Sequence, residues 1–159
     1  MITKDILLYE NGDGGQLDTS NNDIQLTELL YQQVYICLFG GNVEAVTKGN
    51  ELESELRNDW WGNPLFFKDK KNKQFNSVTE KTLNETVLNP AGRQTIKRAV
   101  ESDLQCLSGI AKTEVTIKLP SSSKVEILVR LKQPQNEQDV TLQIIWSNAR
   151  KELITFKTI

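Results

Sequence analysis

The sequence holds 159 residues, of which 38% are hydrophobic and 25% charged, with a net charge of −2. This length is typical of one domain, since domains hold roughly 100–200 residues, and the composition excludes a disordered or fibrous chain. No apolar run approaches the roughly 18 residues of a membrane span, and no apolar segment follows a basic start as in a signal peptide. We therefore expect a protein that folds in the cytoplasm and has no membrane partner.

Histidine is absent, which removes the commonest general base and the commonest transition-metal ligand together. Cys37 and Cys106 are the only thiols and are too few for a zinc site. Each lies inside an apolar helical pattern, so we expect both to be buried, reduced core residues rather than members of a disulfide framework. No metal or other cofactor is expected.

Charge is unevenly spread along the chain. Residues 1–75 carry 7 basic and 12 acidic residues, whereas residues 76–159 carry 12 basic and 9 acidic residues. No basic stripe with interleaved aromatic residues appears, so we expect no nucleic-acid partner, and the lysine cluster at 68–73 is typical of a solvated loop. A chain that is acidic at one end and basic at the other could stack head to tail on its neighbours, but the asymmetry could equally have no function.

Short strands and turns are predicted over residues 1–27. Asp5–Tyr9 is a short apolar run that favours a strand. Asn11–Gly15 breaks it, because glycine and asparagine or aspartate adopt the positive φ angles of tight turns. Ile24–Leu26 alternates as a second short strand. The pattern predicts an N-terminal β-hairpin or arm.

Helices and a long loop are predicted over residues 28–109. A first helix is expected to begin at Thr27-Glu28 and to end at Gly40-Gly41, and a polar loop of about 20 residues follows it. Ser77-x-x-Glu80 matches a capping box and predicts a helix that runs to about Leu88. Asn89-Pro90 matches an N-cap followed by proline at the first helical position, and predicts a helix that ends at Ser108-Gly109.

A strand meander is predicted over residues 110–159. Three segments, beginning near Val115, Val125 and Val140, alternate apolar and polar residues, and Leu153–Phe156 adds a last short strand. Sequential antiparallel strands after a pair of helices indicate an α+β fold, with an antiparallel sheet of C-terminal strands covered by helices. We expect a single domain over residues 1–159.

The densest aromatic cluster lies at Trp60–Phe67. One interpretation makes Trp60 and Trp61 a core plug that fixes the long loop to the helices, since indoles bury a large area. The other makes the pair an interface anchor, since tryptophan is enriched at binding hot spots. An intermediate arrangement turns one indole inward and the other toward a partner.

Few residues suggest catalysis or ligand binding. Asn11, Asp13 and Gly15 resemble the start of a calcium loop, but Asn22 stands where the closing glutamate belongs. The glycines at 12–15 lack the Gly-Lys-Ser/Thr ending of a phosphate-binding loop. The loop carboxylates at 51, 53, 55 and 59 have polar neighbours, so nothing predicts the raised pKa of an acid catalyst. We expect no enzyme and no small-molecule substrate.

Four features in this order resemble the Mu-type phage tail protein family. They are Asp5-Ile-Leu-Leu, the Gly-Asp-Gly-Gly turn at 12–15, the helix end Leu38-Phe39-Gly40-Gly41-Asn42, and Asp59-Trp60-Trp61-Gly62-Asn63 after a polar loop. The resemblance covers nearly the whole chain, and the Trp-Trp-Gly motif is its only specific part. It implies a structural component of a contractile-tail baseplate, related to the wedge proteins sometimes labelled lysozyme-like. The Glu-Pro-Arg triplet of that wider group is absent from this sequence.

The resemblance implies an assembly protein without catalysis, located in the tail baseplate of a phage, prophage or tailocin particle and in the host cytoplasm during assembly. Its partners would be other baseplate and tail proteins, with self-association as a further contact. We expect Trp60, Trp61, Gly62 and Phe39 to act as structural or interface anchors. Leu153 and Phe156 would lie on a sheet edge that pairs with a neighbouring chain.

Two other functions stay open from the sequence. A tail-associated, lysozyme-like cell-wall hydrolase would need two carboxylates in a cleft, and a turbidity assay on peptidoglycan would detect its activity. A calcium-binding or small-molecule-binding module would need the turn at Gly12–Gly15 to order around its ligand, and a melting shift with calcium would detect that binding.

Overall fold

The computed structural model describes residues 4–10, 15–19, 22–41, 52, 60, 62–68, 74–75, 77–134 and 139–159. Internal contacts divide the chain into two compact units, residues 1–35 and residues 36–159. Each unit is described by itself below, and the single domain expected over 1–159 stays a prediction. Across the residues described, no helix is both long enough and apolar enough to span a membrane.

The first unit contains the predicted N-terminal hairpin. Strands β2 (Leu8–Glu10) and β3 (Gly15–Leu17) pair antiparallel on either side of the predicted turn, and β1 (Lys4–Ile6) pairs antiparallel with β4 (Leu26–Glu28). The single strand expected over Asp5–Tyr9 is divided at Leu7. The Leu7 amide donates to the Gln25 carbonyl at 2.9 Å, and its carbonyl accepts from the Asp18 amide at 3.2 Å. The chain thus changes pairing partner at Leu7, while the backbone groups of this residue remain hydrogen-bonded.

Helix α1 (Leu29–Phe39) begins in the first unit and ends in the second. It does not begin at Thr27-Glu28 as expected, because these two residues pair with β1 as part of β4. Gln32 of α1 is buried, and its side-chain amide binds both backbone groups of Leu8. Gln32 Oε1 accepts from the Leu8 amide at 3.0 Å, and Gln32 Nε2 donates to the Leu8 carbonyl at 3.3 Å. The helix ends where the glycine pair predicts, since the Gly40 amide donates to the Ile36 carbonyl at 2.9 Å.

The second unit contains the predicted meander, a four-stranded antiparallel sheet in the order β5-β6-β7-β8. Its strands are β5 (Lys112–Ser121), β6 (Lys124–Lys132), β7 (Val140–Ser147) and β8 (Glu152–Thr158). The apolar residues of the sequence pattern are the ones that are buried in the structure, because successive side chains of a strand point to opposite faces of the sheet. On β6 the four residues Val125, Ile127, Val129 and Leu131 are all buried.

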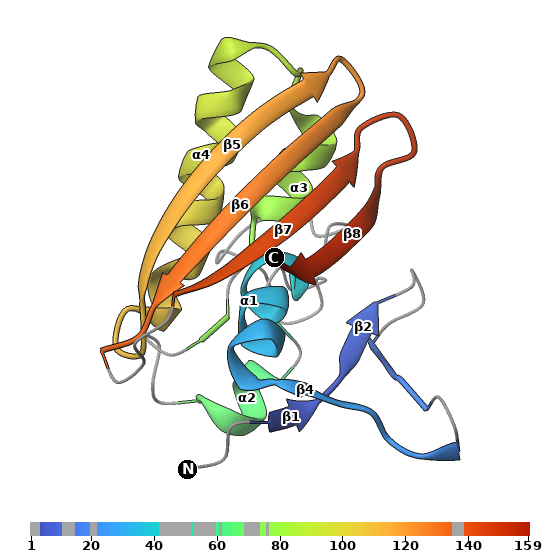
Figure 1. Ribbon diagram of the computed structural model, residues 1–159, viewed down its shortest axis with the longest axis vertical. Coiled ribbons are helices and arrows are strands. Elements are labelled where there is room, and N and C mark those ends of the chain that lie inside the picture. Colours follow the sequence, from blue (N-terminus) through green and yellow to red (C-terminus); the bar gives the residue numbers. More distant parts are fainter. Residues whose placement is uncertain are drawn as a thin grey trace. The chain divides into compact units, whose positions relative to one another are not determined.

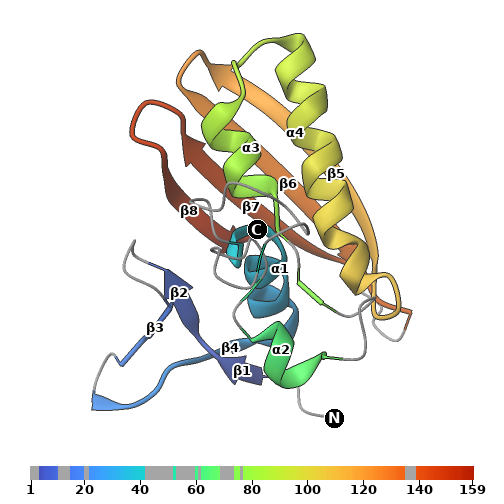
Figure 2. The ribbon, with the colours of Figure 1, turned by 180° about the vertical axis from the view of Figure 1, so that it is seen from behind.

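Helices cover one face of this sheet, so the α+β architecture expected from the sequence is present. Helices α3 (Thr79–Glu85) and α4 (Pro90–Asp103) lie behind the sheet in Figure 1 and in front of it in Figure 2. The short 3₁₀ helix η3 (Leu104–Leu107) continues α4, and α2 (Asn63–Phe66) precedes α3 in the chain. The core of the second unit contains Leu38, Leu83, Ile96, Leu104, Leu107, Ile127, Leu131, Leu142, Ile144 and Trp146, all fully buried.

The start of α4 is as predicted, and the start of α3 is not. Asn89 caps α4, and its Oδ1 accepts from the Gly92 amide at 2.7 Å. The capping box predicted at Ser77 is wrong, because α3 begins at Thr79 and no side chain of its own N-cap residue bonds to it. The carboxylate of Asp103 replaces the box, with Oδ2 accepting from the Val78 and Thr79 amides at 2.8 Å each.

Asp103 therefore joins the end of α4 to the start of α3. The end of α1 is hydrogen-bonded to the segment just before α3. Thr79 Oγ1 donates to Asp103 Oδ2 at 2.6 Å, and Ser77 Oγ donates to the Leu38 carbonyl at 2.5 Å. Gly41 allows this approach, since a Cβ atom there would overlap the carbonyl oxygen of Ser77. We call this group of Leu38, Ser77, Thr79 and Asp103 the helix junction.

The two cysteines form a disulfide, so the expectation of reduced thiols is wrong. Cys37 lies in the last turn of α1 and is buried, and Cys106 lies in η3. The helix junction places the ends of α1 and α4 together, which brings the two sulfur atoms into contact although 69 positions separate them in the sequence. The helical pattern of apolar residues indicates that each cysteine faces the core, but it does not indicate that the two cysteines lie next to each other there.

Candidate functional site

An aromatic cluster surrounds α2, in the region where the sequence has its highest aromatic density. The indole of Trp60 stacks on the ring of Phe66 at 6.0 Å and meets the ring of Phe75 edge-on at 5.4 Å, measured between ring centroids. Phe67 completes the cluster, at 5.8 Å from Phe75 and 6.4 Å from Phe66. Such stacked and edge-to-face pairs add about 0.5–1.5 kcal/mol each beyond the apolar area that they bury.

Asn63 fixes the backbone beneath the aromatic cluster. Its side chain is fully buried and bonds to both backbone groups of Phe75, with Nδ2 donating to the carbonyl at 2.7 Å and Oδ1 accepting from the amide at 3.0 Å. The Trp60 amide also donates to the Phe75 carbonyl, at 3.1 Å. The cluster is therefore tied across a gap of 12 residues by hydrogen bonds as well as by ring packing.

Gly62 is required for the packing of Trp60. A Cβ atom at Gly62 would overlap the six-membered ring of the Trp60 indole. The backbone itself does not require glycine, since Gly62 has a φ of −79° and a ψ of −13°, which any residue adopts. Glycine is therefore needed at position 62 of the Trp-Trp-Gly motif because a larger residue would collide with Trp60.

We expect Gly62→Ala to displace the Trp60 indole and to lower the free energy of unfolding by about 1–3 kcal/mol, because overpacking forces neighbouring side chains to move. Urea unfolding followed by tryptophan fluorescence measures both effects. Gly109→Ala is the control, since a Cβ atom there meets nothing within 4 Å. Equal stability of the two variants would show that the contact between Gly62 and Trp60 is not close.

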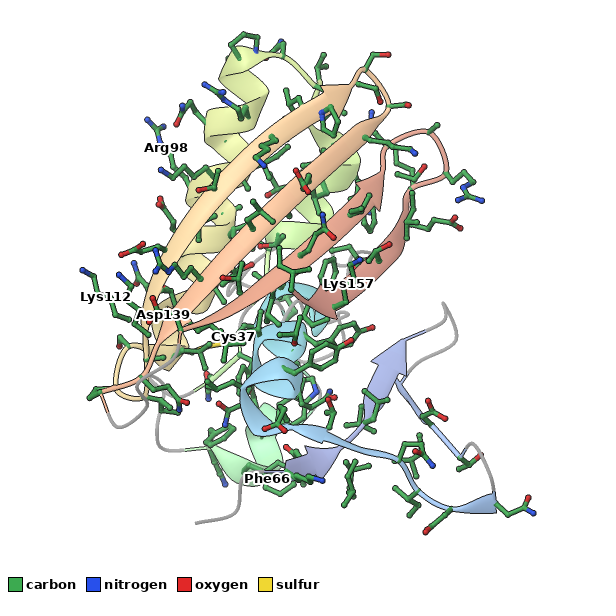
Figure 3. All side chains as sticks on the ribbon, viewed as in Figure 1. Cys37, Phe66, Arg98, Lys112, Asp139 and Lys157 are labelled. Atoms are coloured by element: carbon green, nitrogen blue, oxygen red, sulfur yellow. A yellow bond between two sulfur atoms is a disulfide. The ribbon has the colours of Figure 1, made fainter. Side chains whose placement is uncertain are left out.

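The outer side of α2 exposes two large apolar side chains. Leu65 is 72% exposed and Phe66 is 63% exposed, while Trp60 is half-buried behind them. Figure 3 labels Phe66, whose side chain projects from α2. We call Leu65 and Phe66 the α2 patch. A rigid aromatic side chain held in place by a packed base is the type of residue that supplies most of the energy at protein interfaces.

The other predicted anchors lie on or beside the sheet. Phe39 is buried, and its ring stacks on Trp146 at 6.4 Å and meets Phe156 edge-on at 6.3 Å. Leu153 is half-buried and pairs with Trp146 across the β7–β8 ladder. These residues form part of the packing that attaches β8 and the end of α1 to the sheet.

Strand β8 is an edge of the sheet, as predicted for Leu153–Phe156. In the part of the chain that the structure describes, it pairs only with β7. The register shifts between Ile145 and Trp146, which leaves Ile154 without a partner residue and exposed. At the opposite edge, β5 carries Pro120, a residue that has no N–H to offer an added strand.

The structure thus separates the predicted site residues into two groups. Trp60 and Gly62 belong to the aromatic cluster, whereas Phe39, Leu153 and Phe156 belong to the sheet. Trp61 lies outside the described residues, as do the four loop carboxylates, the glycines at 12 and 14, and Lys70, Lys71 and Lys73. Of the described residues, no three histidine, cysteine, aspartate or glutamate side chains gather where a metal ion could bind.

Sequence reasoning missed Asn63, Phe75 and the α2 patch as members of the site. Asn63-Pro64 repeats the Asn-Pro pattern that starts α4, which indicates a helix start and could have placed Leu65 and Phe66 on a short helix. No local signal identifies Phe75, because it joins Trp60 through contacts between segments.

The uncovered face of the sheet carries a hydrogen-bonded charge network around Glu126. Gln143 Nε2 donates to Glu126 Oε1 at 2.5 Å, and Lys118 Nζ lies 3.5 Å from Glu126 Oε2. The Gln143 hydrogen bond and the Lys118 charge both favour the ionised carboxylate, and they hold the pKa of Glu126 below its ordinary value. A lowered pKa stabilises the fold at pH values above the ordinary pKa, and this contribution is lost as the pH falls through the lowered one.

We expect Gln143→Ala to raise the pKa of Glu126 toward its ordinary value, because the largest cause of its lowering is removed. An NMR titration of the Glu126 side-chain carboxyl measures the change. Gln94→Ala is the control, since Gln94 lies exposed on α4, on the other side of the sheet. An unchanged pKa in Gln143→Ala would contradict the assignment of this hydrogen bond as the main cause.

Comparisons of this chain with protein-family models, with curated proteins and with solved structures found no match.

Proposed function

We propose that this chain is a non-catalytic structural component of a contractile tail baseplate, and that it acts in tail assembly through contacts with other proteins. The resemblance of its motifs to the Mu-type phage tail proteins supplies the setting. The observation that carries the proposal is the α2 patch, where Leu65 and Phe66 are exposed on a base that ring packing and the Asn63 hydrogen bonds hold in place.

Rigidity of the α2 patch favours a binding role over an accidental exposure. An exposed aromatic residue that is already ordered loses little conformational freedom when a partner covers it. Trp60 supports Phe66 from behind, so the motif residues Trp60 and Gly62 would act as positioning residues while the α2 patch touches the partner. This division of roles combines the two interpretations of the motif, a packed plug and an interface anchor.

The edge of the sheet supplies a second contact. Strand β8 pairs on one side with β7, and a neighbouring chain could add a strand to its other side through main-chain hydrogen bonds. The inward packing of Phe156 on Phe39 holds β8 in place for such an addition.

The test is binding of the purified full chain to the tail proteins encoded beside it, measured by light scattering and by calorimetry. Leu65→Ser and Phe66→Ser should each weaken the complex about tenfold or more, as expected for hot-spot residues. Val87→Ser is the matched control, because Val87 is 72% exposed, as is Leu65, but lies outside α2. Binding that none of the three variants alters would refute the role of the α2 patch, and absence of binding to every neighbour would refute the proposed function.

A further inference from the structure

The N-terminal strands expose several aliphatic side chains to solvent. We call residues 4–28, which contain β1 to β4, the arm. Four of its aliphatic side chains are exposed, namely Ile6, Leu17, Ile24 and Leu26. Ile6 and Leu26 are direct cross-strand partners in the β1–β4 pair, so two of them form one continuous exposed surface. Exposed apolar residues that adjoin across neighbouring strands make this surface a candidate interaction site.

The arm is also strongly acidic. Within residues 1–35 the sequence has one lysine, Lys4, and six acidic residues. Asp23 and Glu28 are exposed beside the aliphatic residues Ile24 and Leu26. A partner for the arm should therefore present apolar side chains surrounded by positive charge.

The face of the sheet that the helices leave uncovered has this character. In the second unit, α3 and α4 lie on the opposite face (Figures 1 and 2). Strand alternation places on the uncovered face, which we call the open face, six basic and three acidic residues of the strands: Lys112, Lys118, Lys124, Arg130, Lys132 and Lys157, with Glu114, Glu126 and Glu152. Asp139 adds a fourth acidic residue, bound to Arg130 at 2.6 Å.

Two apolar side chains lie in the middle of the open face, beside the Glu126 network. Leu128 and Ile145 are half-buried there, on neighbouring strands, with Leu128 between its ladder partners Thr116 and Gln143. At the rim, Lys112 and Lys157 lie at opposite edges of the sheet (Figure 3). Among the described residues, neither these two lysines nor Lys124 is in an ion pair. Apolar residues surrounded by polar and charged ones are common in protein interfaces.

We propose that the arm of one chain docks on the open face of a second copy of this chain, head to tail. The exposed aliphatic residues of the arm would cover Leu128 and Ile145, and Asp23 and Glu28 would face the basic rim. The arm and the open face are complementary in charge and in apolar character, and both belong to the same chain. A second copy of this chain is therefore the partner that these two surfaces favour. The inference rests on the proposed assembly function and names one partner for it.

A head-to-tail contact has a consequence that a symmetric contact lacks. Each pair formed this way retains one unused arm and one unused open face, so that further copies add until a ring closes or a filament grows. Self-association should therefore proceed beyond the dimer as the concentration rises. It should also weaken when the salt concentration rises from about 0.05 M to about 0.5 M, because the rim charges are exposed to solvent.

The experiment uses the full chain and three variants, studied by sedimentation at several concentrations. The arm variant is Asp23→Lys with Glu28→Lys, and the face variant is Lys124→Glu with Lys157→Glu. The control variant, Arg93→Glu with Arg98→Glu, has the same net charge as the face variant but alters the exposed surface of α4. The arm and face variants should each weaken self-association about tenfold or more, since two charges at the contact change sign in each variant, and the control should not.

Mixing the arm variant with the face variant is the decisive step. The arm variant keeps an intact open face and the face variant keeps an intact arm, and the two altered surfaces are again opposite in charge, so the mixture should recover the association that neither variant shows alone. A mixture that remains monomeric would overturn the head-to-tail contact, as would a wild-type chain that stays monomeric up to about 1 mM. Equal weakening by the control would likewise overturn it, because net charge alone would then explain the effect.

These outcomes are separate from those of the proposed function. A chain that binds the neighbouring tail proteins but never itself refutes the head-to-tail contact and leaves the assembly function standing. A chain that associates with itself as described, but with no tail protein, refutes the baseplate proposal and leaves the contact between arm and open face standing.

Discussion

Reduction of the Cys37–Cys106 disulfide should lower the free energy of unfolding by about 2–4 kcal/mol, one of the two largest effects expected for this protein. The bond closes a loop between residues separated by 69 positions. In the chain-entropy account a loop of this length restricts the unfolded chain by about 4 kcal/mol, and measured values for disulfides are usually somewhat smaller. The disulfide also ties the end of α1 to η3, beside the helix junction.

Urea unfolding of the wild-type protein with and without a thiol reductant measures this effect. Cys106→Ala is the control, since it has no disulfide and its stability should not respond to the reductant. Labelling of free thiols in urea, without reductant, gives an independent count. Two labelled thiols in the unreduced protein, together with a stability that the reductant leaves unchanged, would contradict the disulfide and restore the expectation of reduced core cysteines.

Asp103→Ala should destabilise the fold by about 2–4 kcal/mol. The carboxylate is buried and accepts hydrogen bonds from the Val78 amide, the Thr79 amide and the Thr79 hydroxyl. Loss of a helix cap typically costs about 1 kcal/mol, and each buried donor left without a partner adds about 1–3 kcal/mol before the structure relaxes. The variant leaves two such amides at the start of α3, at the point where α1 and α4 also end.

The control for Asp103→Ala lies on the same helix. Glu101 is about half-exposed, and its pairing with Lys97 at 3.6 Å is an ion pair between successive turns. Such pairs contribute about 0.3–0.5 kcal/mol, so Glu101→Ala should be nearly neutral in urea unfolding. If the two alanine variants had equal stability, the cap from Asp103 to α3 would not exist in solution. Asp103→Asn should fall between them, because it keeps one acceptor oxygen and loses the charge.

The parts of the fold that the sequence predicted are those with a strong local pattern. Strands β5 to β7 follow from alternation, since their buried residues face the helices. The start of α4 follows from Asn89-Pro90, because this cap is made within four residues of sequence. The end of α1 follows from Gly40, for the same local reason.

The errors concern contacts between distant segments. Ser77-x-x-Glu80 has the spacing of a capping box, yet the Ser77 hydroxyl bonds to Leu38 and Asp103 caps the helix instead. A motif of four residues contains no information on which residue elsewhere competes for the same amides. The disulfide was missed for a related reason, because the helical pattern around each cysteine shows only that it faces the interior.

The candidate site was predicted in part. Aromatic density drew attention to Trp60–Phe67, and the structure does pack Trp60 against Phe66 and Phe75. The sequence does not show which aromatic side chain is exposed. That depends on the hydrogen bonds between the Asn63 side chain and the Phe75 backbone, which join segments that no periodic pattern relates. The asymmetry of charge along the sequence was visible, but only the register of the sheet places six basic residues of the strands on one face.

Light scattering of the purified chain, alone and mixed with the tail proteins encoded beside it, tests the central claim most directly. We expect a stable complex in the mixture that Phe66→Ser weakens and Val87→Ser does not. A chain that remains indifferent to every one of these neighbours would contradict the assembly function. The turbidity assay on peptidoglycan would then become the next experiment.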